Sequence, residues 1–397
     1  HMLVFVLNAG SSSLKYQLID IKSKELKASG LVERIGIDGI LKHEIGENKK
    51  ITFELPIPTH KEAIELVLRI LTNDETKVIN SIDEIKAIGH RVVHGGEYFK
   101  GSAIVDDEVI RKIEELIPLA PLHNPANILG VKICKDLMPK VPNVVTFDTA
   151  FHQTMPMENF LYAVPYADYT EHHLRKYGFH GTSHYYVSQE AIKLLNKKDS
   201  KVIVCHLGNG SSVCAVKDGK SISTSMGLTP LEGLVMGTRS GDIDAGVIPY
   251  LMEKKGLSHT QILDYLNKKS GILGVSGVSS DLREVIKAAN DGDKRSKIAI
   301  TMLCDRIKKY LCSYAGLMHG VDAICFTAGI GENSDLIREK VCEGLEFMGI
   351  EIDKDKNSKR EKGNREINTK NSKTKIFVIP TNEELVIATD TYNLLKK

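Results

Sequence analysis

The sequence predicts an α/β protein built from two related lobes, and three observations support this prediction. The length of 397 residues is enough for two domains with separate hydrophobic cores. Strand patterns alternate with helix patterns twice along the chain. One phrase also occurs twice, as Asn8-Ala9-Gly10-Ser11-Ser12 and as Gly208-Asn209-Gly210-Ser211-Ser212. Each copy stands between two runs suited to strands, which indicates two copies of a domain that opens with a hairpin.

The first half is predicted to begin with strands at residues 3–8, 14–20 and 26–34. Thr59 and Glu62 form a capping-box pattern before a helix whose Ala63, Ile64, Val67, Ile70 and Leu71 share one face. The remaining predicted elements are a strand at 86–93 with a Gly95-Gly96 turn, helices at 107–116 and 125–137, and a strand at 143–148. The last of these strands ends on Asp148, and the boundary between the lobes is expected just after it.

The second half repeats this order. Its predicted elements are strands at 202–207, 212–217 and 220–225, helices at 259–268, 281–290 and 295–318, a strand at 323–327, a glycine turn at 329–333 and a helix from about 334. The lysine-rich segment 354–375 has few apolar residues and is expected to be a solvated surface excursion. A strand at 375–379 then leads into a helix that begins at Thr381.

Composition narrows the class of protein. The chain is 42% hydrophobic and 26% charged, with a formal net charge of +2, so no concentrated basic face for nucleic acid is expected. No apolar run approaches the roughly 20 residues that cross a bilayer. The opening run from Leu3 to Leu7 is interpreted as a strand and not as a signal peptide. Seven cysteines without a CxxC pair suggest reduced thiols in a cytoplasmic protein.

Three glycine-rich segments are candidates for phosphate binding. The two repeated turns offer backbone N–H groups and hydroxyls where glycine permits close approach. The third segment, Gly329-Ile330-Gly331-Glu332-Asn333, follows an apolar strand and suits a phosphate or the ribose of a nucleotide. A plain tight turn is the alternative for this segment. Neither a GxGxxG dinucleotide fingerprint nor a GxxxxGK[ST] P-loop is present.

Arginine and histidine gather in polar, glycine-containing loops around Arg91, His180 and Arg239. A glycine-flanked arginine can direct its planar fork at a carboxylate or a phosphoryl group. For each arginine the alternative is an ion pair that bridges the domains, and for His180 it is a packing role. His90 and His94 do not converge in a β-rich segment, so no zinc site is expected.

Three oxygen-bearing side chains are candidate ligands for Mg²⁺. Asp148 stands at the end of its predicted strand, where the alternative is a cap or a turn. Thr381 and Glu384 form a second capping-box pattern, which leaves Glu383 available for a metal ion. Asn8, Asp148 and Glu383 together would supply the few protein oxygens that Mg²⁺ takes beside water and phosphate.

In order along the chain, these segments resemble the acetate and propionate kinase family. Asn8–Lys15 and Gly178–His184 are similar to its two signatures. The other matching segments are His90–Gly96, Pro121–Pro125, Phe147–His152, His206–Ser212, Gly237–Asp244, Gly329–Asn333 and Thr381–Glu384. The resemblance therefore covers nearly the whole chain.

The resemblance implies a fold, a reaction and an assembly. The fold is that of the actin and hexokinase superfamily, with two duplicated ribonuclease-H-like lobes and an active-site cleft between them. Residues 1–149 and 384–397 would form the acetate and Mg²⁺ lobe, and residues 150–383 the nucleotide lobe. The activity would be the reversible transfer of phosphoryl between ATP and acetate, giving ADP and acetyl phosphate, with Mg²⁺, which Mn²⁺ can replace. A cytoplasmic homodimer without nucleic-acid or membrane partners is expected.

The resemblance also implies roles for individual residues. Asn8 and Glu383 would hold the metal, Arg91 would bind the acetate carboxylate, and His180 and Arg239 would stabilise the phosphoryl group. The nucleotide would contact Lys15, His206, Leu207, Gly208, Asn209, Gly210, Asp281, Leu282, Arg283, Gly329, Ile330, Gly331, Glu332 and Asn333. Val93, Leu122 and Pro230 match the family's methyl pocket. Asp148 is the family's conventional acid/base residue, but acetate is already ionised at neutral pH, so we expect a positioning or metal-water role.

Other functions stay open at this point. Propionate or butyrate kinase needs only a wider acceptor pocket. A sugar or glycerol kinase would need a general base for a hydroxyl acceptor and would have no use for the Arg91 loop. A chaperone or filament ATPase would need a partner-binding region beyond the two lobes.

Overall fold

A computed structural model describes residues 2–397 of the chain. Its residues form two compact units. Unit 1 runs up to Gln153 and also contains Asn382–Lys397, and unit 2 is Thr154–Thr381. Each unit is an α/β domain built around its own mixed sheet, which confirms the predicted fold class.

The sheet of unit 1 has eight strands in the order β5-β4-β3-β2-β1-β6-β8-β7. The strands are β1 (Leu3–Ala9), β2 (Leu14–Asp20), β3 (Glu25–Glu33), β4 (Ile40–Ile45), β5 (Lys49–Glu54), β6 (Ile85–Val92), β7 (Ala103–Ile104) and β8 (Asn143–Phe147). Strands β1 to β5 pair antiparallel in sequence order. By contrast, β6 lies parallel to both β1 and β8. The carboxyl ends of β6 and β8 therefore lie side by side, immediately before Val93 and Asp148.

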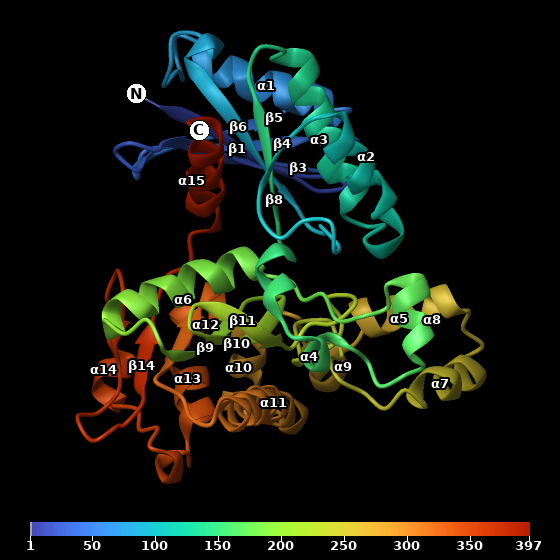
Figure 1. Cartoon of the computed structure of the whole chain (residues 1–397), viewed down its shortest axis with the longest axis vertical. Helices are drawn as coiled ribbons and strands as arrows, with labels where there is room; N and C mark the ends of the chain where they lie inside the picture. Colours follow the sequence, from blue (N-terminus) through green and yellow to red (C-terminus); the bar gives the residue numbers. More distant parts are fainter. Residues whose placement is uncertain (1) are drawn as a thin grey trace. The chain divides into compact units, whose positions relative to one another are not determined.

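Helices cover the sheet of unit 1. They are α1 (His60–Thr72), α2 (Asp107–Glu115), α3 (Asn124–Leu137) and α15 (Glu383–Leu395), with short 3₁₀ turns η1 (Ile82–Glu84) and η2 (Ile117–Leu119). The predicted apolar face of α1 is buried, and its N-cap Thr59 accepts a hydrogen bond from the N–H of Glu62. The C-terminal helix α15 packs against β1, β6 and β8, so the red end of the chain lies among blue strands in Figure 1.

One glycine permits this packing of α15. A Cβ atom added to Gly89 on β6 would lie 2.6 Å from Thr391 Oγ1 and 2.7 Å from Ile387 Cγ2, both on α15. A larger residue at 89 would therefore push α15, and with it Glu383, away from the sheet.

The sheet of unit 2 has six strands in the order β11-β10-β9-β12-β14-β13. Its elements are α4 (Met157–Phe160), α5 (Tyr166–His172), α6 (Gly181–Leu195), β9 (Lys201–Leu207), β10 (Ser211–Lys217), β11 (Lys220–Thr224), α7 (Val247–Lys255), α8 (His259–Lys268), α9 (Gly271–Ser276), α10 (Leu282–Asn290), α11 (Lys294–Met318), β12 (Ala323–Thr327), α12 (Ala328–Asn333), α13 (Asp335–Cys342), η4 (Glu346–Met348), α14 (Lys354–Ser358), β13 (Arg365–Glu366) and β14 (Lys375–Val378). The 3₁₀ turn η3 (Ala150–Thr154) joins the two units along the chain. Helix α6 packs against β9 and β12, and the long helix α11 packs against β9 and β10 (Figure 1).

The two sheets share one topology. Five strands correspond in order, β3-β2-β1-β6-β8 in unit 1 and β11-β10-β9-β12-β14 in unit 2. In each set the first three strands pair antiparallel and the last three pair parallel, with the central strand common to both groups. The repeated Gly-Ser-Ser phrase lies in the equivalent hairpin of each set. The predicted duplication is therefore confirmed.

Some local predictions were wrong. The second capping box does not form, because Asn382 is the N-cap of α15 and Thr381 Oγ1 contacts Ser183 Oγ at 2.7 Å. The glycine segment after β12 is the short helix α12 and not a turn. The segment 354–375 is only partly a surface excursion, since Ile367 joins the core of unit 2. The hairpin of β4 and β5 and the helix α6 were not predicted at all.

Two predictions about composition can be compared with the structure. All seven cysteines are free thiols, and all except Cys312 are buried. Within residues 2–397, no helix has both the length and the apolar character that a membrane span requires.

Candidate functional site

The central feature of unit 1 is an ion pair between Arg91 and Asp148. Arg91 lies near the end of β6, opposite Thr146 in the register, and Asp148 directly follows β8. Arg91 Nε donates to Asp148 Oδ1 at 2.9 Å and Nη2 donates to Oδ2 at 2.6 Å. The charge of Asp148 raises the pKa of Arg91 further above its usual value. Two of the five guanidinium N–H groups are used in this pair, which leaves three for a substrate.

An ion pair between the domains was the alternative role for Arg91. The structure places both partners of the Arg91 ion pair in unit 1 instead. Asp148 is almost fully buried, whereas the Arg91 side chain is 28% exposed. The carboxylate is therefore a fixed support, and the guanidinium keeps an accessible side.

Glu383 lies in the first turn of α15, close enough to Arg91 and Asp148 to interact with both charges. Burial raises the pKa of its carboxyl to about 7, Arg91 opposes this shift, and Asp148 and Glu384 add to it. Asn8 lies on β1, paired with Lys15 on β2. A partly buried carboxylate is costly to keep charged, and a bound cation would offset that cost.

The residues of the predicted methyl pocket differ in exposure. Val93 is buried, and its N–H donates to Asn127 Oδ1 at 2.9 Å. Asn127 in turn donates to the carbonyl of Ala9 at 2.8 Å, which ties Val93 to the end of β1. Leu122 is 74% exposed, and Pro230 belongs to unit 2.

His180 in unit 2 is held in a strained place. It is the N-cap of α6 and adopts a left-handed backbone with φ of 55°, which is uncommon for a residue other than glycine and is often found at functional sites. Its Nδ1 lies 2.8 Å from Ser212 Oγ, and the same hydroxyl lies 2.7 Å from His184 Nε2. Its ring stacks on that of His206, with centroids 4.1 Å apart. These contacts fix both the plane and the tilt of the imidazole.

Arg239 converges with His180 on Gly210. A Cβ atom added to Gly210 would lie 3.4 Å from Arg239 Nη2 and 3.7 Å from His180 Cε1. Arg239 Nη1 donates to the carbonyl of Pro230 at 3.1 Å. Burial lowers the pKa of Arg239, but a guanidinium stays charged at neutral pH. Gly210 therefore faces a half-buried positive charge and a hydrogen-bonding imidazole.

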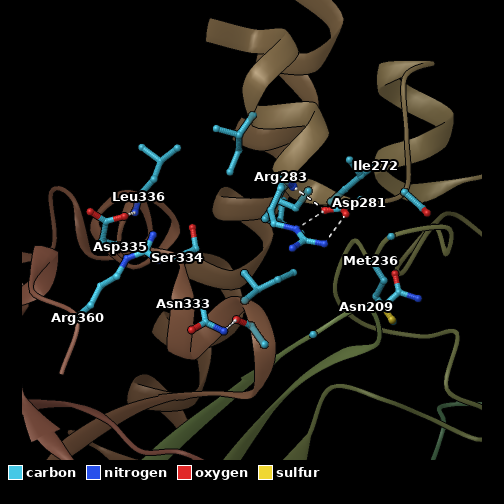
Figure 2. A pocket seen from close by; sticks show the side chains of 18 residues that line it. Asn209, Met236, Ile272, Asp281, Arg283, Asn333, Ser334, Asp335, Leu336 and Arg360 are labelled. Atoms are coloured by element: carbon cyan, nitrogen blue, oxygen red, sulfur yellow. Dashed lines mark hydrogen bonds and ion pairs between the residues drawn. The ribbon is translucent and has the colours of Figure 1, made fainter. Parts of the chain in front are cut away.

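A cavity of about 910 Å³ lies in unit 2 beside this group of residues. Figure 2 shows Asp281 and Arg283 on one side of it and Ser334, Asp335 and Arg360 on the other. Eight residues predicted to contact nucleotide line it, namely Gly208, Asn209, Asp281, Leu282, Arg283, Gly329, Ile330 and Asn333. Its volume and its mixture of apolar and polar groups suit a nucleotide.

Other residues predicted to bind nucleotide do not line this cavity. They are His206, Leu207, Gly210, Gly331 and Glu332, together with Lys15, which belongs to unit 1.

The hairpin turns also offer fewer donors than expected. The N–H of Gly10 donates to the carbonyl of Ser13 and that of Gly208 to the carbonyl of Gly210, so these two groups are used within their own turns.

The cavity also contains residues that the sequence analysis missed. They are Met236, Gly237, Ile272, Ser280, Ile286, Leu303, Ser334, Asp335, Leu336 and Arg360. Most are apolar or come from segments without a motif, so no sequence signal marked them. Gly237 is different, because it stands two residues before Arg239 in a glycine-containing segment that had been noticed. A Cβ atom there would lie 2.3 Å from Asn209 Oδ1, so glycine leaves room for the Asn209 side chain.

A duplicated α/β fold with a nucleotide-sized cavity beside a converging arginine and histidine is the arrangement expected of a phosphotransferase. A sequence model of the Acetokinase family matches residues 3–389, and the chain belongs to this family. The predicted class of enzyme, a phosphotransferase with a carboxyl-group acceptor, is thereby confirmed.

Individual relatives agree with this assignment. The acetate kinases of Treponema denticola and Fusobacterium nucleatum are 55% and 56% identical to this chain, and each comparison covers 100% of both chains. The crystal structure of Porphyromonas gingivalis acetate kinase superposes with a TM-score of 0.96 at 48% identity, covering 100% of both chains. A propionate kinase from Francisella tularensis superposes with a TM-score of 0.93 at 45% identity, covering 99% of this chain and 100% of the other.

Proposed function

We propose that this protein catalyses the reversible transfer of the γ-phosphoryl group of ATP to acetate. The observation that carries the proposal is the convergence of Arg239 and His180 on Gly210, next to the nucleotide-sized cavity. Asn209, the neighbour of Gly210, lines this cavity. A phosphoryl group at the end of a nucleotide bound there would meet one cationic and one hydrogen-bonding side chain.

Arg91 is the proposed site for the acetate carboxylate. Asp148 holds one edge of the guanidinium and so directs the remaining N–H groups toward a second carboxylate. Val93, two residues further along and buried, would then contact the methyl group. These contacts support the specificity for a short carboxylic acid.

The chemistry needs no proton transfer to or from acetate. An acetate oxygen forms a bond to the γ-phosphorus, the bond from that phosphorus to the β–γ bridging oxygen breaks, and ADP leaves with the electron pair. The obstacle is the approach of one anion to another. Positive and donating groups remove this obstacle: Arg239 and His180 would do so at the phosphoryl group, and Arg91 at the acetate carboxylate. The buried ion pair with Arg91 supports a positioning role for Asp148.

Mg²⁺ is the proposed metal, and the residues present fit it. The described residues contain no group of three or more His, Cys, Asp or Glu side chains placed so that they could hold a metal ion. Mg²⁺ needs only one or two protein carboxylates, because it keeps waters and substrate phosphates as ligands. Asn8 and Glu383 would hold it, and the ion would neutralise charge on the phosphate oxygens.

The decisive experiment compares acceptors. Acyl phosphate is trapped with hydroxylamine while ADP release is followed with acetate, propionate, butyrate, glycerol or no acceptor. We expect ADP release that depends on acetate and matches the acyl phosphate formed. ADP release without any acceptor would instead indicate an ATPase. Faster turnover with propionate would move the assignment to a propionate kinase.

Two further expectations are also proposals. We propose a homodimer and a cytoplasmic location, both supported by the resemblance to the family. Light scattering after size-exclusion chromatography tests the first, because a monomer would have the 43.9 kDa mass of one chain and a homodimer twice that mass. Fractionation of cells tests the second.

A further inference from the structure

The segment from Gly227 to Asp242, here called the Arg239 loop, carries both Pro230 and Arg239. Its two parts meet where Arg239 Nη1 donates to the carbonyl of Pro230 at 3.1 Å. The loop also carries two carboxylates, Glu232 and Asp242, that the proposed mechanism does not use. Each of them accepts a short hydrogen bond from a tyrosine outside the loop.

Asp242 closes the base of the part that carries Arg239. Its Oδ1 accepts from the N–H of Gly233 at 2.9 Å, and its Oδ2 accepts from the hydroxyl of Tyr310 at 2.5 Å. The N–H of Asp242 donates back to the carbonyl of Gly233 at 2.9 Å. Tyr310 lies on α11, one turn after Arg306, which donates to the same carbonyl at 3.0 Å. The long helix α11 therefore holds the loop at two points.

The backbone of this part is also packed tightly. Gly241 has a left-handed backbone with φ of 66°, and a Cβ atom there would lie 2.3 Å from the carbonyl oxygen of Leu234. Gly271, at the start of α9, has its ideal Cβ position 2.7 Å from the carbonyl oxygen of Arg239. The position of the Arg239 backbone is thus set by neighbours on two sides.

Glu232 holds the other part, which carries Pro230. Its Oε1 accepts from the hydroxyl of Tyr162 at 2.5 Å, and its Oε2 accepts from Lys176 Nζ at 2.7 Å. The hydroxyl of Tyr162 also accepts from the N–H of Leu228 at 2.9 Å. A Cβ atom at Gly227 would lie 2.2 Å from this hydroxyl, so glycine is required beside it.

We propose that these two tyrosine–carboxylate pairs position the Arg239 guanidinium through two different contacts for the proposed reaction. Asp242 with Tyr310 sets the place of the Arg239 guanidinium and so controls the rate of transfer. Glu232 with Tyr162 sets the place of the Pro230 carbonyl, which accepts from Arg239 Nη1, and so acts on the same guanidinium. Hydrogen bonds to a carboxylate are strong and directional, which suits them to this task. The proposal rests on the function proposed above.

The test removes one hydroxyl at a time. Tyr310→Phe should lower kcat for acetate about tenfold or more, since small displacements of a positioned group cost that much, and should leave KM for ATP unchanged. Tyr162→Phe should also lower kcat for acetate, because the Pro230 carbonyl that Tyr162 helps to place holds Arg239. The matched control is Tyr98→Phe, because Tyr98 also donates to a carboxylate, Glu115 Oε2 at 2.8 Å, but belongs to unit 1. It should change neither quantity.

A double-mutant cycle separates positioning from general damage. In an Arg239→Ala background, Tyr310→Phe should have no further effect on kcat, because its action passes through Arg239. Tyr310→Phe should also speed amide hydrogen exchange in residues 233–242 and not in unit 1. An unchanged kcat in Tyr310→Phe, or an equal further loss in the Arg239→Ala background, would overturn the proposal. Hydrogen exchange needs no substrate, so it tests the pairs even if the wild-type protein fails to phosphorylate acetate.

Discussion

Asp148 holds the guanidinium of Arg91 through two parallel hydrogen bonds, 2.9 Å from Nε to Oδ1 and 2.6 Å from Nη2 to Oδ2. The pair joins the ends of two adjacent parallel strands, so the sheet itself sets its geometry. Asp148 is the buried partner and Arg91 the accessible one, as expected for a support and the group that it supports.

Replacing Asp148 should therefore disturb Arg91 without removing a general base. We expect Asp148→Ala to cost at most about 3 kcal/mol of stability, because Arg91 can still reach solvent, and to raise KM for acetate. Asp148→Asn should lower kcat and keep the shape of the wild-type pH–rate profile. Denaturant unfolding and steady-state kinetics measure both effects. If the Asn variant lost one limb of its pH–rate profile, a proton-transfer role would have to be accepted.

Arg239 should be intolerant of conservative change. Arg239→Ala should lower kcat about 10³-fold or more, as for other charge-stabilising arginines in phosphoryl transfer. Arg239→Lys should recover little, because a lysine lacks the planar fork that bonds Pro230 and still faces Gly210. Arg111→Ala, at an exposed position on α2, is the control and should match the wild type. Near-normal turnover in Arg239→Ala would remove this residue from the mechanism.

Gly237 should control nucleotide binding through Asn209. A methyl group at 237 would lie 2.3 Å from Asn209 Oδ1 and must displace that side chain, which lines the cavity. Gly237→Ala should therefore raise Kd for ADP several-fold, measured by calorimetry. Gly316→Ala is the matched control, because no atom lies within 4 Å of the added group. Equal affinities in the two variants would show that Asn209 does not contact the nucleotide.

Val93 should limit the length of the acceptor. One methylene in such a pocket is worth about 1–3 kcal/mol, so the wild-type protein should use propionate, with lower efficiency than acetate. Val93→Ala should narrow this difference. Leu122→Ala should do so less, because Leu122 is largely exposed. Competition between the two acids, followed by the acyl phosphates formed, measures the ratio. Equal kcat/KM values in the wild type would contradict the preference for acetate.

His90 should make the fold sensitive to acid. Burial lowers its pKa from 6.5 to about 4, while its Nε2 lies 2.7 Å from Asn143 Oδ1. The unfolded chain takes up this proton near pH 6.5 and the folded chain only near pH 4. The stability that neutral His90 contributes to the folded state is therefore fully present above pH 6.5 and is lost as the pH falls toward 4. The loss reaches about 3 kcal/mol, at about 1.36 kcal/mol per pKa unit.

The measurement is urea unfolding between pH 7 and pH 4.5. His90→Gln should flatten the pH dependence of the free energy of unfolding, whatever its effect at pH 7. His259→Gln, at an exposed position, should leave the slope unchanged. A His90 variant with the full wild-type slope would place the acid sensitivity elsewhere in the protein.

Much of the fold followed from local patterns. Glycine, serine and asparagine mark both hairpins, and the apolar spacing of α1, from Ala63 to Leu71, predicted its buried face. Local sequence patterns gave the wrong prediction where tertiary contacts override the local preference of the chain. Thr381 has the residue type and spacing of an N-cap, but its hydroxyl is engaged by Ser183, and Asn382 caps α15 instead. The β4–β5 hairpin was missed because its strands are short and partly charged.

The order of residues by itself determined the duplicated α/β architecture, the three glycine-rich segments and the candidate arginines and histidines, because these depend on backbone preference and side-chain chemistry. Only the tertiary structure decided what each group contacts. It directed Arg91 at Asp148 because parallel pairing of β6 and β8 brings their ends together. It also joined Asp242 to Tyr310, 68 residues apart, because α11 packs against the Arg239 loop. Such contacts depend on packing between distant segments, which no local pattern encodes.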